Sequence, residues 1–229
     1  MNNKLIGTSL VIGGLLQMTR MIPIAASDGI KMFENFPPHN VEDTIRAATA
    51  SGWLISHIMV FISSIFLISG FYSLSQKLKK NGQDKAAIFS FVGLSIGFII
   101  YNIGAVIDGL FLPVVSHEFL DSIASEKKSW SVLVGYTHEF AISFGGLAFA
   151  HLLLSTGLLS LALNRIKEFK LFGIIGLVIG SVAFIGYITG ILDLMVTGSF
   201  FLTGGLTMLM FIFFFVLGIK LIRKPNSIS

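Results

Sequence analysis

Ionisable side chains interrupt several apolar stretches of this chain, and they are the residues best suited to chemistry. His57 and His138, together with Asp108 or Glu139, could form an imidazole–carboxylate metal site. Two histidines on different helices could instead ligate a haem. Arg20 could join Asp108 in a charge-assisted ion pair between two helices.

The spacing of the histidines argues against one metal shared among them. His138 and His151 are 13 residues apart, which separates them by about 20 Å on nearly opposite faces of a helix. Helix rise places His57 and His138 at depths that differ by roughly 10 Å. The chain has no cysteine and no HExxH pattern, which excludes disulfides, thiolate metal sites and that zinc motif. The sequence therefore identifies neither a cofactor nor a reaction.

Composition shows which elements must position these side chains. Of 229 residues, 54% are apolar and only 12% are charged, and the mean hydropathy is +0.85. A soluble domain could not bury so much apolar surface in one core, so we expect lipid around the chain. The composition predicts an all-α polytopic membrane protein, a single domain over 1–229 with about six transmembrane helices. The predicted spans are 5–24, 52–74, 86–115, 136–163, 171–195 and 200–222.

Lysine and arginine are distributed unevenly between the two ends of these spans. One side carries 11 of the 16 bases, and the other side carries five bases together with most of the acidic residues. The positive-inside rule then predicts that both termini are cytoplasmic, and we expect the membrane to be the bacterial plasma membrane. The same rule explains the pI of about 9.4, so no nucleic-acid partner is expected.

Two longer connections are predicted on the outer side of the membrane. In the first, 23–51, Asn40 is expected to cap a helix, with Asp43 at the position that reaches back to the cap. We expect that helix to run directly into the second span. In the second, 115–135, the residues 116–121 predict a short surface helix.

Glycine-containing motifs recur at similar positions in the first, third and fifth spans, at 10–13, 93–97 and 176–180. A helical hairpin repeated three times in one orientation would produce them, although such residues are common in any membrane helix. Small residues allow close helix contacts in lipid, so these faces are predicted to pack between helices. At about 100° per residue, Asp108 lies on the glycine face of the third span.

The polar residues of the spans gather toward the outer side. Counting the rise from the cytoplasmic bases puts Arg20 at roughly 24 Å, His57 at roughly 30 Å and Asp108 at roughly 33 Å, with His138 and Glu139 at about 40 Å. Charged groups in lipid need a partner or a wet cavity. We therefore predict that these five residues form a cluster that binds a small ligand or ion, or docks a partner subunit.

Two other functions remain open from the sequence, and so does the question of whether the protein is an enzyme. A membrane-embedded haem- or metal-dependent redox subunit would use His57 and His138 with a carboxylate. A small transporter would need a polar path across the membrane, and the cytoplasmic half offers only His151 and serines. Association with a partner subunit or as a homo-oligomer is compatible with each of these functions.

Overall fold

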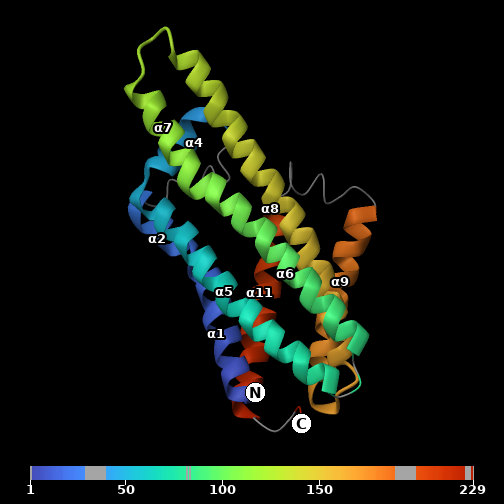
Figure 1. Cartoon of the computed structure of the whole chain (residues 1–229). Helices are drawn as coiled ribbons and strands as arrows, with labels where there is room; N and C mark the ends of the chain where they lie inside the picture. Colours follow the sequence, from blue (N-terminus) through green and yellow to red (C-terminus); the bar gives the residue numbers. More distant parts are fainter. Residues whose placement is uncertain are drawn as a thin grey trace.

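The computed structural model describes residues 2–28, 40–80, 82, 84–188, 200–224 and 228, and within them the chain is helical with no strand (Figure 1). Five of its helical stretches are long and apolar enough to cross a membrane, which is the architecture of a multi-pass membrane protein. These stretches are Asn3–Ser27, Ser51–Lys80, Lys85–Asp121, Lys127–Leu163 and Gly205–Arg223.

The helical elements follow the predicted spans and extend several of them. In chain order they are α1 (Asn3–Thr19), α2 (Met21–Asp28), α4 (Val41–Thr49), α5 (Ser51–Lys80), α6 (Asp84–Val106), η1 (Ile107–Phe111), α7 (Leu112–Asp121), α8 (Lys127–Leu163), η2 (Lys167–Phe169), α9 (Lys170–Ile188) and α11 (Phe200–Arg223). The predicted span 171–195 coincides with α9 as far as Ile188, and its remainder lies outside the described residues.

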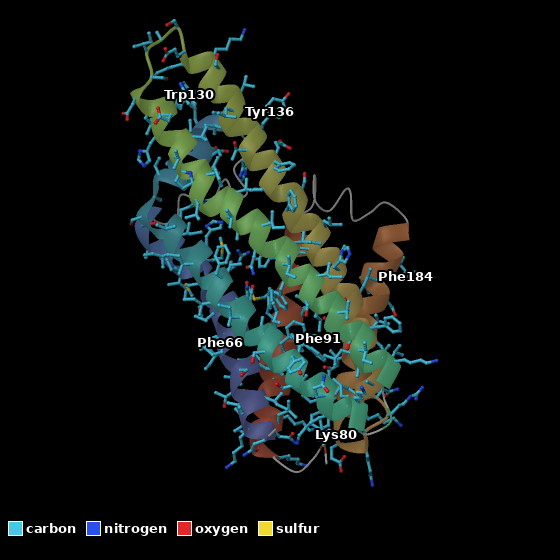
Figure 2. All side chains as sticks on the ribbon, viewed as in Figure 1. Phe66, Lys80, Phe91, Trp130, Tyr136 and Phe184 are labelled. Carbon is cyan, nitrogen blue, oxygen red and sulfur yellow. The ribbon has the colours of Figure 1, made fainter. Side chains whose placement is uncertain are left out.

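The helices pack in an order that brings the last one back to the first. α5 contacts α1 and α6, α8 contacts α6 and α9, and α11 lies along α1. Both chain ends lie at the same end of the bundle in Figure 1, which we call the terminal end. Lys80 lies at this end (Figure 2), where α5 finishes in a basic turn. The opposite end, where α4 and α7 lie, is the capped end.

Lipid explains why so much apolar surface faces outward. In a bilayer each helix satisfies its own backbone hydrogen bonds, so a long apolar segment is stable without a polar coat. Phe184 projects from the outside of α9 and is 54% exposed, and Tyr136 on α8 is 72% exposed (Figure 2). These side chains are placed to contact acyl chains or the membrane interface.

The glycine face predicted for the third span packs against α8. A Cβ at Gly97 would press on Leu152, and one at Gly104 would press on Ala141 and Phe144. Moving along α6 from Gly97 to Gly104 corresponds to moving back along α8 from Leu152 to Ala141, so the two helices run antiparallel. The predicted packing role of this face is confirmed.

The capped end begins with a helix that is polar on one side. Asn40 Oδ1 accepts a hydrogen bond from the Asp43 amide at 2.8 Å, and this confirms the predicted N-cap. The prediction that this helix runs directly into the second span is wrong. α4 ends at Thr49, because Ala50 has an extended backbone with ψ 135°, and α5 begins at Ser51.

A separate small core holds the capped end together. The surface helix predicted at 116–121 is the end of α7, which continues from α6 through η1. α7 and α4 contact each other and both contact α8. The buried members of this core come from α2, α4, α5, α7 and α8, and they are Ile24, Ile45, Ala47, Ala48, Trp53, Leu112 and Val134.

Candidate functional site

One carboxylate near the capped end joins two histidines from two other helices. Asp108 Oδ2 lies 3.2 Å from Nε2 of His57 on α5. Asp108 Oδ1 lies 3.2 Å from Nδ1 of His138 on α8. We call these three residues the His57–Asp108–His138 cluster.

The backbone around Asp108 has a local irregularity. Asp108 is the second residue of η1, a π-helical turn inserted between α6 and α7, and such turns are frequent at functional sites. The next residue, Gly109, packs directly on the His57 side chain, where a Cβ would collide with the imidazole. The missing side chain at Gly109 therefore allows α5 to bring His57 against this turn.

Trp53 holds both His57 and the π-helical turn in place. Its indole Nε1 donates to the main-chain oxygen of Asp108 at 2.7 Å. Its own carbonyl oxygen lies 2.7 Å from His57 Nδ1, and the two rings are 5.0 Å apart between centroids. Trp53 is itself buried in the small core of the capped end, so the orientation of His57 is fixed by packing as well as by hydrogen bonds.

The antiparallel register of α6 and α8 places His138, the third member of the cluster. Gly104 on α6 faces Ala141 on α8, and Asp108 lies about one turn further along α6 on the same face. His138 lies about one turn back along α8 from Ala141, which is where an antiparallel partner must stand. The hydrogen bond between Asp108 and His138 therefore continues the same helix contact.

The side chains of the cluster are largely buried. The side chains of His57 and His138 are each 9% exposed, and that of Asp108 is 20% exposed. A buried carboxylate is tolerated when hydrogen bonds and a countercharge compensate its desolvation. Both oxygens of Asp108 have such a partner.

Several buried polar atoms in this region have no hydrogen-bond partner. They include Nε2 of His138, the hydroxyl of Tyr101 and both amide atoms of Gln17. The guanidinium of Arg20 lies 5.6 Å from the Tyr101 ring centroid, and Gln17 precedes Arg20 by about one turn at the end of α1. An unpaired buried polar group costs about 1–3 kcal/mol, so these atoms are suited to form hydrogen bonds with a bound molecule, with Nε2 of Gln17 as a donor.

The structure brings together three of the five predicted site residues. The predicted ion pair between Arg20 and Asp108 is wrong for the described part of the chain, because both carboxylate oxygens face histidines and Arg20 lies over Tyr101. Glu139 is exposed and stays outside the cluster. It follows His138 by one residue, and the rotation of about 100° turns it away from Asp108.

The predicted difference in depth between His57 and His138 is also wrong, since one carboxylate contacts both side chains. The depth calculation assumed that every helix runs perpendicular to the membrane and that the cytoplasmic bases of all helices lie at the same depth. In Figure 1 α5, α6 and α8 slant across the bundle, whereas α1 is steeper. Residues at different counts along slanted helices can therefore meet.

The hydrogen-bonded arrangement does not present the imidazoles to a common metal. Within the described residues, no three His, Asp or Glu side chains are grouped to hold an ion. Both ring nitrogens of His57 are engaged, by Trp53 O and Asp108 Oδ2. Only Nε2 of His138 is directed away from the cluster without a partner.

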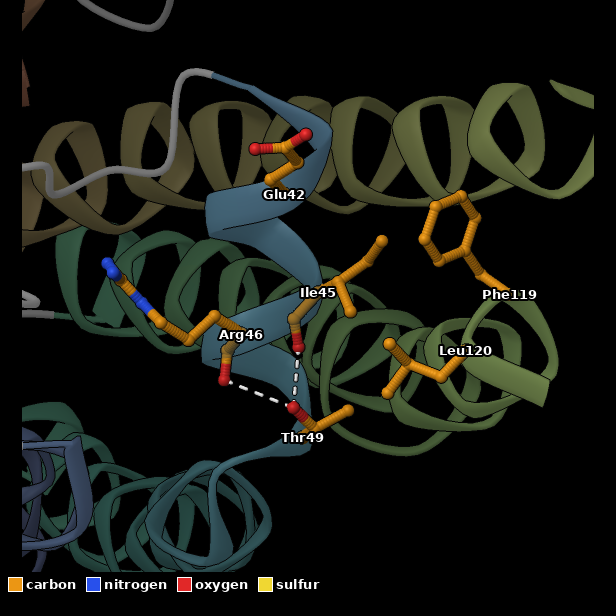
Figure 3. A pocket seen from close by; sticks show the side chains of 6 residues that line it. All are labelled: Glu42, Ile45, Arg46, Thr49, Phe119 and Leu120. Atoms are coloured by element: carbon orange, nitrogen blue, oxygen red, sulfur yellow. Dashed lines mark hydrogen bonds between the residues drawn. The ribbon is translucent and has the colours of Figure 1, made fainter. Parts of the chain in front are cut away.

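A cavity of about 260 Å³ lies at the capped end between α4 and α7 (Figure 3). The hydroxyl of Thr49 is part of the cavity wall, but it already donates to the carbonyl oxygens of Ile45 and Arg46. Arg46 pairs with Asp43 at 3.4 Å. The cavity is lined by Glu42, Ile45, Arg46, Thr49, Phe119 and Leu120. Its walls favour an apolar occupant, and the cluster is the better candidate for polar chemistry.

The sequence analysis missed Trp53 and Gly109 as parts of the site. A signal for Trp53 was present, because it precedes His57 by four residues and therefore shares its helix face. No comparable signal marks Gly109, because its role depends on where α5 crosses the π-helical turn.

No protein-family model, curated protein or solved structure matches this chain. The function must therefore be argued from the geometry of the cluster.

Proposed function

We propose that this multi-pass membrane protein binds a small polar ligand at the His57–Asp108–His138 cluster. The observation that carries the proposal is the state of His138, whose Nδ1 is held by Asp108 while its buried Nε2 has no partner. A nitrogen fixed in this way can accept a hydrogen bond without reorganising the site. The ligand would therefore carry an N–H or O–H donor.

Neighbouring groups support the same class of ligand. The Tyr101 hydroxyl and the Gln17 amide are buried without partners and can each donate or accept. Arg20 adds a positive charge over Tyr101. A small molecule with both donors and acceptors could satisfy several of these atoms at once, which is how polar groups fix a ligand's orientation in an otherwise apolar site.

The proposal includes an orientation in the membrane. We propose six spans with both termini in the cytoplasm of a bacterial plasma membrane, and three hairpins of one ancestral repeat. The basic turns at the terminal end support the orientation, and the cluster would then lie in the outer half. A reporter that is active only outside the cytoplasm should be inactive when fused after Ser229, and an active fusion would reverse the orientation.

A thermal-stability assay on protein in lipid nanodiscs tests the binding proposal. The probes are imidazole, which donates and accepts, ammonium, which only donates, and acetate, which only accepts. Imidazole or ammonium should raise the midpoint of unfolding, and acetate at the same ionic strength should not. The shift should disappear in His138→Ala.

His151→Ala is the matched control, because His151 lies on the same helix and its Nδ1 contacts only the carbonyl oxygen of Leu147, at 3.0 Å. This variant should keep the shift. Equal shifts in the His138→Ala protein, or no shift with either donor probe, would refute ligand binding at the cluster.

A further inference from the structure

Both ring nitrogens of His57 face oxygen atoms. Nδ1 lies 2.7 Å from the carbonyl oxygen of Trp53, and Nε2 lies 3.2 Å from Oδ2 of Asp108. A carbonyl oxygen can only accept a hydrogen bond, and so can an ionised carboxylate. A neutral imidazole carries one N–H, so neutral His57 beside ionised Asp108 would leave one of these two contacts without a hydrogen.

Two arrangements satisfy both contacts. In the first, His57 is an imidazolium that donates from both nitrogens to Trp53 and to ionised Asp108. In the second, His57 is neutral and donates from Nδ1, while protonated Asp108 donates from Oδ2 to Nε2. Both arrangements hold the same number of protons and give the pair no net charge. A neutral pair is the form that a membrane interior tolerates, because an isolated charge there is costly.

Trp53 favours a positive charge on His57 in two ways. Its carbonyl oxygen accepts from Nδ1, and the centroids of the indole and imidazole rings are 5.0 Å apart. A cation within about 6 Å of an indole centroid is attracted by the ring. The imidazolium form of His57 is therefore stabilised by Trp53 and does not depend on solvent.

His138 differs from His57 because only one of its nitrogens is engaged. With Asp108 Oδ1 as an acceptor, His138 donates from Nδ1, and its buried Nε2 then carries a free lone pair. From this geometry we infer that the cluster is a proton-exchange site. It shares one proton between His57 and Asp108 and takes up a second at Nε2 of His138.

The uptake step can be written atom by atom. A proton from a donor forms a bond to Nε2 of His138, and the N–H bond at Nδ1 breaks as its proton passes to Oδ1 of Asp108. The proton shared at Oδ2 stays on Nε2 of His57. The cluster gains one positive charge, which resides on His57 against the carbonyl and indole of Trp53. Release reverses each step, and no electrons are transferred.

Among the residues that the structure describes, few other charged groups stand near this path. Arg20 on α1 lies over Tyr101, and Tyr101 is the nearest further titratable group on α6. α4 supplies Asp43 and Arg46, which pair with each other. The remaining charged or titratable groups on α4, on α7 and on the same part of α8 are exposed, and they are Glu42, His117, Glu118, Asp121, Tyr136 and Glu139. The cluster therefore exchanges its proton largely independently of other buried charges.

The test counts protons directly, by nitrogen-15 NMR of histidine-labelled protein in nanodiscs together with infrared spectra in H₂O and D₂O. At neutral pH, His57 should carry hydrogen on both nitrogens, or Asp108 should show a protonated-acid band that shifts in D₂O. His138 should have a bare Nε2 that becomes protonated as the pH falls. His57 with one bare nitrogen beside an ionised Asp108 would overturn the inference.

Asp108→Asn provides a second test in a variant that is expected to fold. Its amide mimics protonated Asp108, because the oxygen can accept from His138 and the NH₂ can donate to His57. His57 should then become neutral with a bare Nε2, and the acid band should be lost. Two hydrogens retained on His57 in this variant would contradict the shared proton.

His151 is the internal control in both spectra. It has the same contact to a main-chain carbonyl as His57 but no carboxylate partner, so its nitrogen-15 signals should be the same in the wild type and in Asp108→Asn. The experiment uses no added ligand. If the donor probes do not bind, the spectra predicted here are unaffected. If the spectra contradict the shared proton, the thermal-stability assay still decides whether the cluster binds a ligand.

Discussion

The two ends of the bundle are held together by different kinds of contact. At the terminal end, Gly7 of α1 meets Gly218 of α11 so closely that a Cβ on either would press on the other's backbone. Lys77 donates there to Oδ1 of Asn3 at 2.5 Å and to the carbonyl oxygen of Ile228 at 3.0 Å, while Nδ2 of Asn3 is buried without a partner. Close packing of α1 on α11 therefore dominates the contacts at this end.

The cluster near the capped end is held together by ionisable side chains. Asp108 holds two histidines, and Nε2 of His138 and the hydroxyl of Tyr101 are buried without partners. Unpaired buried groups lower stability, and a buried charged group in lipid lowers it further. The ends therefore differ in that ionisable side chains meet at the cluster, where we propose that the function lies, whereas close helix packing dominates at the terminal end.

The largest effect is expected from Asp108→Ala. Removing the carboxylate leaves His57 and His138 buried without their shared partner, and breaking a buried pair costs about 3 kcal/mol. Asp108→Asn should lose far less, because its amide can satisfy both histidines. Midpoints of thermal unfolding in nanodiscs measure both variants. Equal losses would show that the hydrogen-bond pattern of Asp108 does not matter.

A smaller but still substantial loss is expected from Gly218→Leu at the terminal end. The new side chain must displace the backbone of α1 at Gly7, and overpacking typically costs about 1–3 kcal/mol. The unfolding midpoint should fall, while binding of imidazole or ammonium at the cluster should remain. Loss of probe binding in protein that is still folded would break the proposed division between the two ends.

The smallest effect is expected from Trp53→Phe. The ring still fills the small core, but the hydrogen bond to the main-chain oxygen of Asp108 is lost, which costs about 0.5–1.5 kcal/mol. The variant should also shift the nitrogen-15 signals of His57, because the ring beside it changes. Unchanged signals would show that Trp53 does not orient this histidine.

The sequence was sufficient to predict an all-helical chain with several apolar spans, and three of its five predicted site residues lie together in the cluster. His57, Asp108 and His138 are ionisable residues in apolar segments, and such residues are rare enough in lipid to be noticed. The helical period also put Asp108 on the glycine face of α6, which packs on α8 and so leads to His138. These conclusions need only local rules.

The partner of each charge could not be predicted, because it depends on how helices slant and cross. Arg20 had the right charge for Asp108, yet it lies over Tyr101. The π-helical turn at Asp108 and the crossing of α5 at Gly109 decide which side chains reach the carboxylate. Neither feature follows from hydropathy or residue spacing.

The central claim is that α5 brings His57 against the π-helical turn that carries Asp108. Disulfide crosslinking tests it most directly, because the chain has no cysteine. A Cβ at Gly109 would stand 2.4 Å from the Cβ of His57, so a local shift of about 1 Å brings the two to the Cβ separation of a disulfide. The variant with His57→Cys and Gly109→Cys should form an intramolecular disulfide on mild oxidation in membranes, detected by mass spectrometry.

The pair His151→Cys and Gly109→Cys is the matched control, since His151 lies about 20 Å along α8 from His138. The account predicts a crosslink in the first pair and none in the control. No crosslink in the first pair, in protein that reaches the membrane, would contradict the account.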